Sequence, residues 1–289
     1  MIREWALRKS LLGVVVLLLL VILGSACQEP GSQAVPPLTR FSDLAGKGVR
    51  IGIVDPDLGP AGRYAVAVLE KLKLSDATAA AAINNNIVTS ESHVRALLDK
   101  LRRREVDAGF IYRSDAQTAT DSLNVIEIPA SFSVSPEYAL ARIQGSLYPD
   151  DALDFIVWLM ASAQRETWVK YGFKPPPVSA SAVNATPAAV AAPPASKVNL
   201  TVFAAAVFYD ILKDLAQKYM SLNHIEIACE FAGSGKLYQK IEQGAQGRYG
   251  ADIFLSAAPR YVIELGDSGL ADQQQIFMRN DLVVGVVKP

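Results

Sequence analysis

Hydrophobic positions along this chain form short continuous runs that alternate with stretches of helical spacing. The continuous runs predict strands at 49–54, 106–112, 125–128, 137–143, 200–206, 225–231, 251–256 and 282–287. Apolar residues three or four positions apart predict helices from Pro60 onward and at 94–101, 151–172 (two helices), 209–220, 236–243 and 259–265. Strands that alternate with helices indicate an α/β fold, with parallel or mixed sheets flanked by helices.

Three stretches interrupt this alternation. Residues 28–44 are mostly polar and contain three prolines, and we interpret them as a tether. Ala79 to Asn86 is rich in Ala and Asn and is expected to be a loop insertion, with an extended helix as the alternative. Residues 175–197 contain mainly Pro, Ala and Ser and predict a linker, because they offer few large apolar groups to pack.

The first 27 residues read as a targeting segment. Basic residues precede an apolar run from Leu11 to Leu23, which is too short for a comfortable membrane span. Small residues then lead to Cys27, in a pattern that resembles a bacterial lipoprotein cleavage site. The resemblance implies a lipid on Cys27 that anchors the protein to the cell membrane, and an ordinary signal anchor is the alternative. Both interpretations place the protein outside the cytoplasm.

Charge and motif content exclude several functions. The chain has 28 basic and 29 acidic residues, and no basic stripe that would favour nucleic acid. Its two histidines have no metal-ligand spacing. No G-x-S-x-G, C-x-x-C or H-E-x-x-H motif is present, and Gly233–Lys236 lacks the flanking residues of a phosphate-binding P-loop. We therefore expect a protein that is not an enzyme and has neither a metal site nor a cofactor.

Three predicted turns from a strand into a helix stand out, at 203–207, 231–236 and 55–64. Ligands of open α/β sheets bind beyond the carboxyl ends of the strands. Helix N-termini at these ends offer free N–H groups and the positive end of the helix dipole. The three turns therefore indicate a site for a small anion.

The motifs at these turns resemble those of the periplasmic molybdate-binding proteins, which belong to the type II solute-binding family of ABC importers. The resemblance rests on VNLTVFAAA, FAGSGKLYQKIEQGAQGRYGADIFLSA, RNDLVVGVVKP, DLAGKGVRIGIVDPDLGPAGRYA, EVDAGFIYRSDA and VKYGF. It covers nearly all of 41–289 except the linker. It implies a two-lobed Venus-flytrap fold in which both lobes close over one tetrahedral oxyanion.

Matching the motifs residue by residue implies the ligand-binding groups. Ser234 and Tyr112 match hydroxyl donors of the family, and Ala61 and Val94 match backbone N–H donors. The family presents a further serine where this chain has Val207, so only the backbone N–H remains there. A lost hydrogen bond to a charged ligand costs about 1.5–3 kcal/mol, which puts the affinity or the preferred anion in question.

The two halves of the resemblance occur in reversed order. Residues 198–289 resemble the beginning of the family and 38–174 its end, so we interpret the chain as a circular permutant. The expected segments are a signal peptide 1–27, a tether 28–44, one lobe 45–136, a single crossover strand 137–143, a second lobe 144–174 plus 198–289, and the linker 175–197.

The resemblance implies an extracytoplasmic, monomeric binding lipoprotein that captures molybdate or tungstate and passes it to an ABC permease. Three alternatives stay open. The same fold could bind another small anion, or serve as a sensor without a permease. It could also be a degenerate protein in which Val207 marks lost binding. An enzyme built on this fold is disfavoured by the absence of a catalytic constellation.

Overall fold

The structure of the protein is a computed structural model that describes residues 37–175, 198–244 and 250–289. The predicted signal peptide with Cys27, most of the predicted tether and most of the predicted linker lie outside these residues. No helix in the described ranges is long and apolar enough to cross a membrane.

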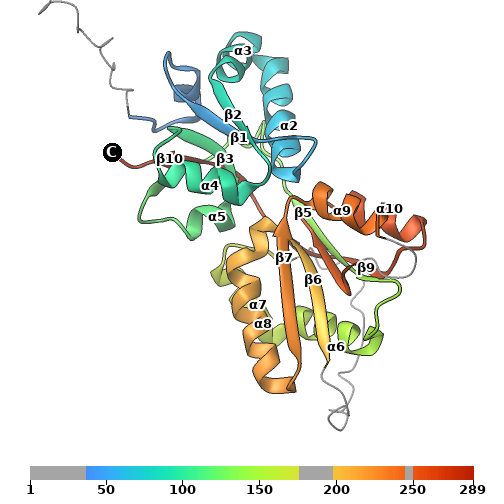
Figure 1. The fold of residues 1–289 in the computed structure, drawn as a ribbon. Coiled ribbons are helices and arrows are strands. Elements are labelled where there is room, and N and C mark those ends of the chain that lie inside the picture. The colour runs from blue at the N-terminus through green and yellow to red at the C-terminus, as the bar shows by residue number, and fades with distance from the viewer. Residues whose placement is uncertain (1–36, 176–197, 245–249) are drawn as a thin grey trace, which may run out of the picture. The chain divides into compact units, whose positions relative to one another are not determined.

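The first of two lobes, lobe A, is built on a five-stranded mixed sheet in the order β2-β1-β3-β10-β4 (Figure 1). Strand β1 runs parallel to β2 and β3, and β10 runs antiparallel to β3 and β4. The elements of lobe A are η1 (Phe41–Ala45), β1 (Ile51–Val54), α2 (Pro60–Ser75), α3 (Ala77–Asn85), β2 (Ile87–Glu91), α4 (Val94–Arg102), β3 (Ala108–Tyr112), α5 (Arg113–Gln117), β4 (Leu123–Ile126) and β10 (Leu282–Val287).

Lobe B contains the second five-stranded mixed sheet, in the order β7-β6-β8-β5-β9. Strand β6 runs parallel to β7 and β8, and β5 runs antiparallel to β8 and β9. The elements of lobe B are β5 (Glu137–Ile143), α6 (Pro149–Met160), α7 (Ser162–Lys170), β6 (Asn199–Ala205), η2 (Ala206–Phe208), α8 (Tyr209–Asn223), β7 (Glu226–Ala232), α9 (Ser234–Glu242), β8 (Ile253–Ser256), α10 (Pro259–Asp267) and β9 (Ala271–Arg279). Two mixed sheets flanked by helices agree with the predicted fold class.

Local packing fixes the start of α2 against the end of β1. Pro60 occupies the first turn of the helix, where a missing N–H costs nothing. A Cβ atom at Gly62 would lie 2.1 Å from the carbonyl oxygen of Val54, so only glycine allows this approach. The close contact holds Ala61 at the carboxyl end of β1.

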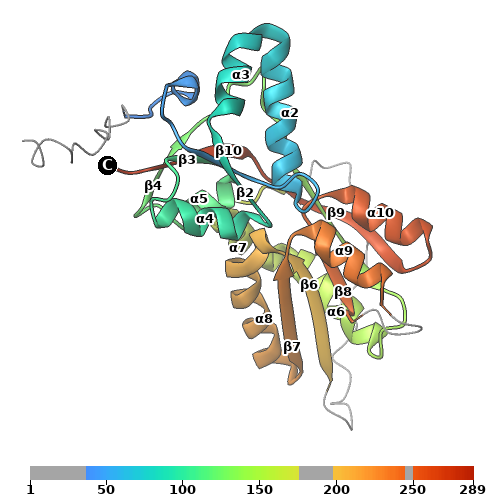
Figure 2. The same cartoon turned by 45° about the horizontal axis from the view of Figure 1, so that its top comes forward.

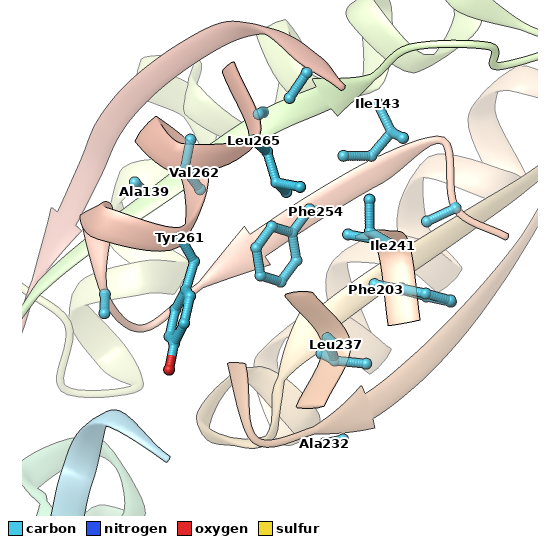
Figure 3. Close-up of a cluster of buried hydrophobic side chains, with 14 residues drawn as sticks. Ala139, Ile143, Phe203, Ala232, Leu237, Ile241, Phe254, Tyr261, Val262 and Leu265 are labelled. Carbon is cyan, nitrogen blue, oxygen red and sulfur yellow. The ribbon is translucent and has the colours of Figure 1, made fainter. Parts of the chain in front are cut away.

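A hydrophobic cluster fixes α9 and α10 on the sheet of lobe B (Figure 3). Leu237 and Ile241 of α9 and Val262 and Leu265 of α10 are buried around Phe254 of β8. Burial of these side chains contributes about 1.5–3 kcal/mol each and sets the position of the first turn of α9.

Four segments differ from the sequence-based expectation. The expected loop at 79–86 is largely helix α3, because its alanines favour helix where Asp76 supplies an N-terminal cap at Ala79 N (2.8 Å). Strands β2 and β9 were not predicted, since their polar residues leave no continuous apolar run. The expected crossover 137–143 is an ordinary strand, β5, between β8 and β9.

The expected lobe of 144–174 plus 198–289 is wrong in its last segment, because 282–287 belongs to the other lobe. Strand β10, red in Figure 1, lies between β3 and β4 of lobe A. Its residues are apolar on both faces, a pattern that predicts a buried strand without indicating which sheet buries it.

The chain therefore crosses between the lobes twice rather than once, through 127–136 and through Asn280 and Asp281. Asn280 N donates to the carbonyl oxygen of Pro136 (2.9 Å), which joins the two crossings. The buried Asn280 amide also donates to Ser114 in lobe A (2.8 Å) and Tyr138 in lobe B (3.0 Å). These hydrogen bonds tie the crossings to both lobes.

Candidate functional site

A small pocket lies where the two lobes meet. All five predicted site residues line it: Ala61, Val94, Tyr112, Val207 and Ser234. Lobe A supplies the first three and lobe B the other two. The cavity volume is about 20 Å³, little more than the roughly 10–15 Å³ that one water molecule needs. The pocket in this closed arrangement therefore suits a very small solute.

Ser234 is the first residue of α9 and is fully buried. Its hydroxyl oxygen accepts a hydrogen bond from Ala257 N (3.0 Å), the single hydrogen bond of this hydroxyl within the described residues. The contact fixes the oxygen at the pocket wall and leaves the hydroxyl proton free to be donated. Ser234 can therefore act as a donor to a bound solute.

Tyr112 ends β3, and its side chain is 1% exposed. Its ring packs edge-on against Tyr64 and Tyr138, with centroids 6.4 Å and 5.7 Å away. Burial raises the pKa of the Tyr112 phenol well above 10, so the group keeps its proton. The Tyr112 hydroxyl has no hydrogen-bond partner within the described residues. A buried hydroxyl without a partner costs about 1–3 kcal/mol, so this group is suited to meet an acceptor in the pocket.

Three helix N-termini also border the pocket, at Ala61 of α2, Val94 of α4 and Ser234 of α9. Backbone N–H groups of a first helical turn have no partner inside the helix. Gly59 and Gly233, the residues before α2 and α9, provide no side-chain cap for these groups. The ends of α2 and α9 therefore add N–H groups without a side-chain cap, and all three helices direct positive dipole ends at one small space.

Val207 lies in η2, between β6 and α8, and is buried. Its apolar side chain lines the pocket beside Ala206. The predicted site residues of lobe B thus contribute one hydroxyl, that of Ser234. The family resemblance leads us to expect a second one at the position of Val207.

Sequence reasoning did not single out His93, which also lines the pocket. His93 Nδ1 accepts from Ala96 N (3.2 Å) and caps α4, which puts the proton of the neutral ring on Nε2. Burial lowers the pKa of His93. The positive charge of Lys236 lowers it further, and the negative charge of Asp99 opposes both effects. The ring is therefore neutral at pH 7, and the pocket lining carries no full charge.

Outside the pocket, the described residues contain no cluster of His, Cys, Asp and Glu that could hold a metal ion. Asp55 Oδ1 accepts a hydrogen bond from Asp57 N (2.8 Å), which stabilises the turn after β1. Burial raises the pKa of the Cys229 thiol to about 11, which makes it unreactive at neutral pH.

Two lobes that meet around a small pocket lined with hydrogen-bond donors define a binding protein for a small solute. The chain belongs to the family of bacterial extracellular solute-binding proteins, whose pattern matches residues 24–174 and 200–289.

Several curated proteins are similar to parts of the chain. A putative ABC transporter substrate-binding lipoprotein of Bacillus subtilis is 30% identical over 138 residues, 47% of this chain and 50% of the relative. A molybdate-binding protein of Mycobacterium tuberculosis is 28% identical over 141 residues, 48% of this chain and 49% of the relative. The one of Escherichia coli is 27% identical over 170 residues, 59% and 62% of the two chains. The chain spans about half the length of the first two relatives.

Among solved structures, the phosphate-binding protein of a phosphate ABC transporter from Streptococcus pneumoniae gives a TM-score of 0.46 at 11% identity, over 82% of this chain and 88% of that one. The arginine-binding protein of Thermotoga maritima gives 0.42 at 10% identity, over 83% and 82%.

Proposed function

We propose that this protein captures a small tetrahedral oxyanion, molybdate or tungstate, outside the cytoplasm and delivers it to the permease of an ABC importer. The observation that carries the proposal is the buried hydroxyl of Tyr112, a pocket-lining residue, which has no hydrogen-bond partner among the residues that the structure describes. An oxyanion supplies the acceptor that this group lacks. Ser234 offers a second hydroxyl donor from the opposite lobe.

Binding proceeds through neutral groups. Hydrogen bonds to an ionised acceptor are about twice as strong as those between neutral groups, and helix N-termini favour negative charge. A pocket without a full positive charge can therefore hold a dianion while still releasing it to a transporter. The named groups are donors, and such a set suits a fully ionised oxyanion better than one that carries its own proton.

The size of the pocket supports a compact ligand. The cavity volume of about 20 Å³ is small even for a tetrahedral oxyanion, so it favours such an ion over an amino acid or a sugar only by comparison. Several curated relatives carry the name molybdate-binding protein, which favours molybdate among the small oxyanions. The hydroxyl that is missing at Val207 keeps another small anion as the alternative ligand.

We also propose that the chain is a circular permutant and a lipoprotein anchored through Cys27. The pocket takes residues from 38–174 and from 198–289, as a permutant requires. Re-joining the segments in the order 198–289 then 38–174 should preserve anion binding. Mass spectrometry of the membrane-bound protein should find lipid on Cys27, and an unmodified Cys27 would contradict the anchor.

Isothermal titration calorimetry with molybdate, tungstate, sulfate and phosphate tests the proposed ligand. Molybdate and tungstate should bind more tightly than sulfate and phosphate, with one anion per chain. Tighter binding of sulfate or phosphate would mean that one of these is the ligand instead of molybdate or tungstate. The absence of a binding heat with all four anions would contradict an oxyanion-binding function. Molybdate uptake by cells with and without this protein then separates import from sensing.

A further inference from the structure

Gly233 lies between β7 and α9, with φ −63° and ψ 139°. Any L-amino acid adopts this extended conformation, so the backbone itself does not require glycine here. The reason for glycine at this position must be the space around its Cα atom.

That space is occupied by the other lobe. A Cβ atom at Gly233 would lie 2.5 Å from the carbonyl oxygen of Leu58 and 2.9 Å from that of Ser92. Contacts below 3.0 Å are essentially never formed by real Cβ atoms. Leu58 and Ser92 belong to turns of lobe A, and their carbonyl groups are backbone atoms that no rotamer change can remove. A methyl group at 233 would therefore push the lobes apart.

Gly235, in the first turn of α9, is also closely approached by the backbone of lobe A. Alanine is normally the better helix residue, so helix propensity does not explain this glycine. A Cβ atom here would lie 3.2 Å and 3.3 Å from the carbonyl oxygens of Leu58 and Asp57 in lobe A. It would also lie 2.7 Å from the hydroxyl of Tyr261, which points out of the lobe B cluster (Figure 3). In Figure 2 the first turns of α2 and α9 face each other across this junction.

We propose that Gly233 and Gly235 are positioning residues for lobe closure: their missing side chains let the backbone of lobe A rest directly on the first turn of α9. This contact brings Ser234, which lies between the two glycines, to the same pocket as Ala61 and Val94. The inference rests on the proposed function to the extent that closure is taken to enclose the solute. The glycines thus affect binding indirectly, by setting how closely the two lobes can approach each other.

Gly62 provides a matched control. A Cβ atom there would meet Val54 and Pro56, which belong to the same lobe. Gly62→Ala should therefore destabilise the folding of lobe A, whereas Gly233→Ala should leave the folding of each lobe intact and change only how the lobes meet. Gln239→Ala, an exposed substitution in the same helix as Gly235, should change neither property.

The test measures the distance between the lobes directly. Spin labels are placed at Leu74→Cys in lobe A and Leu222→Cys in lobe B, which are 91% and 60% exposed. The full chain carries Cys27→Ser and Cys229→Ser so that only the labels react. Pulsed electron spin resonance gives the distance distribution with and without molybdate, and thermal unfolding and calorimetry are run on the same variants.

Gly233→Ala should lose the short-distance population, keep the melting temperature of the unliganded protein, and bind molybdate about tenfold to a hundredfold more weakly. Gly235→Ala should show a smaller loss, which Tyr261→Phe partly reverses by removing the hydroxyl. An unchanged short-distance population in Gly233→Ala overturns the inference, as does its absence from the wild-type protein under all conditions. If that population exists in wild type but does not respond to any oxyanion, the proposed function fails and the closure contact still stands.

Discussion

Arg95 of lobe A and Asp210 of lobe B form an ion pair across the junction, with Arg95 Nη1 2.5 Å from Asp210 Oδ2. The Arg95 guanidinium also lies over the ring of Tyr209, 4.9 Å from its centroid. On the α2 side, Arg63 of lobe A lies 5.2 Å from the ring centroid of Tyr261 in lobe B. Side-chain contacts of arginine with tyrosine therefore join the lobes through both α8 and α10.

Arg95→Gln should weaken anion binding about fivefold and speed up release, because a partly exposed ion pair contributes about 1 kcal/mol to the closed state. Stopped-flow measurement of ligand release checks this expectation. Arg103→Gln is the control, since Arg103 pairs with Glu105 inside lobe A and should not affect binding. Equal release rates in Arg95→Gln and wild type would show that the pair does not hold the lobes together.

Tyr112→Phe should have opposite effects on stability and on binding. Removal of a buried hydroxyl without a partner should raise the melting temperature of the unliganded protein, by about 1 kcal/mol in unfolding free energy, and should lower the anion affinity tenfold to a hundredfold, by about 1.5–3 kcal/mol. The control is Tyr138→Phe, whose hydroxyl accepts from Asn280 (3.0 Å) and whose loss should reduce stability. Calorimetry that finds full affinity in Tyr112→Phe would remove Tyr112 from the site.

Val207→Ser should tighten molybdate or tungstate binding by about 1.5–3 kcal/mol, because it adds a hydroxyl donor at the pocket wall. Val207→Ala enlarges the pocket without adding a donor and so separates the effect of space from that of hydrogen bonding. Calorimetry on both variants decides the matter. Weaker binding by the serine variant, together with a different anion preferred by the Val207 protein, would show that the specificity of the site has moved.

The buried carboxyl of Asp115 should make stability depend on pH. Burial raises its pKa to about 7, against the opposing hydrogen bond from Tyr112 N (3.2 Å). Because the folded-state pKa exceeds the unfolded value near 3.9, this group contributes stability that is complete below pH 4 and is lost as the pH rises to about 7. The loss amounts to at most about 4 kcal/mol.

Asp115→Asn keeps an acceptor for Tyr112 N and removes the titration. Urea unfolding at pH 5 and pH 8 should therefore show a smaller drop in unfolding free energy for the variant than for wild type. The variant should be the more stable of the two at pH 8. Parallel pH profiles for the two proteins would show that Asp115 does not titrate in this range.

The sequence predicted most strands and the helices that follow them, because continuous apolar runs and helical spacing report burial directly. It missed β9, whose central residues are polar, and it placed β10 in the wrong sheet. The apolar residues of a strand show locally that both of its faces are buried. Which sheet the strand joins depends on pairing with strands that are distant in the sequence. The helix α3 was interpreted as a loop because its alanines lack a contrast between apolar and polar faces.

The five predicted site residues meet at one pocket because each lies at or just after the carboxyl end of a strand. The hydrophobic pattern marked four of these strands, whereas β2, which precedes Val94, was not predicted, so Val94 came from the family resemblance alone. Their roles in binding remain predictions. His93 and Gly233 could not be found in this way, since His93 acts through a ring that caps α4 and Gly233 acts through the absence of a side chain. Contacts of backbone carbonyls across two lobes leave no periodic trace in a sequence.

The hydrogen bond from Asn280 N to Pro136 has a mechanical consequence. Two crossings that are bonded side by side form a narrow ribbon, and a ribbon bends far more easily across its face than within its plane. Of the ways in which one lobe could tilt against the other, this connection makes one direction soft and resists the rest. The lobes should then open and close along nearly the same path each time. The hydrogen-bond donors of lobe A and lobe B would therefore return to the same relative positions on every closure.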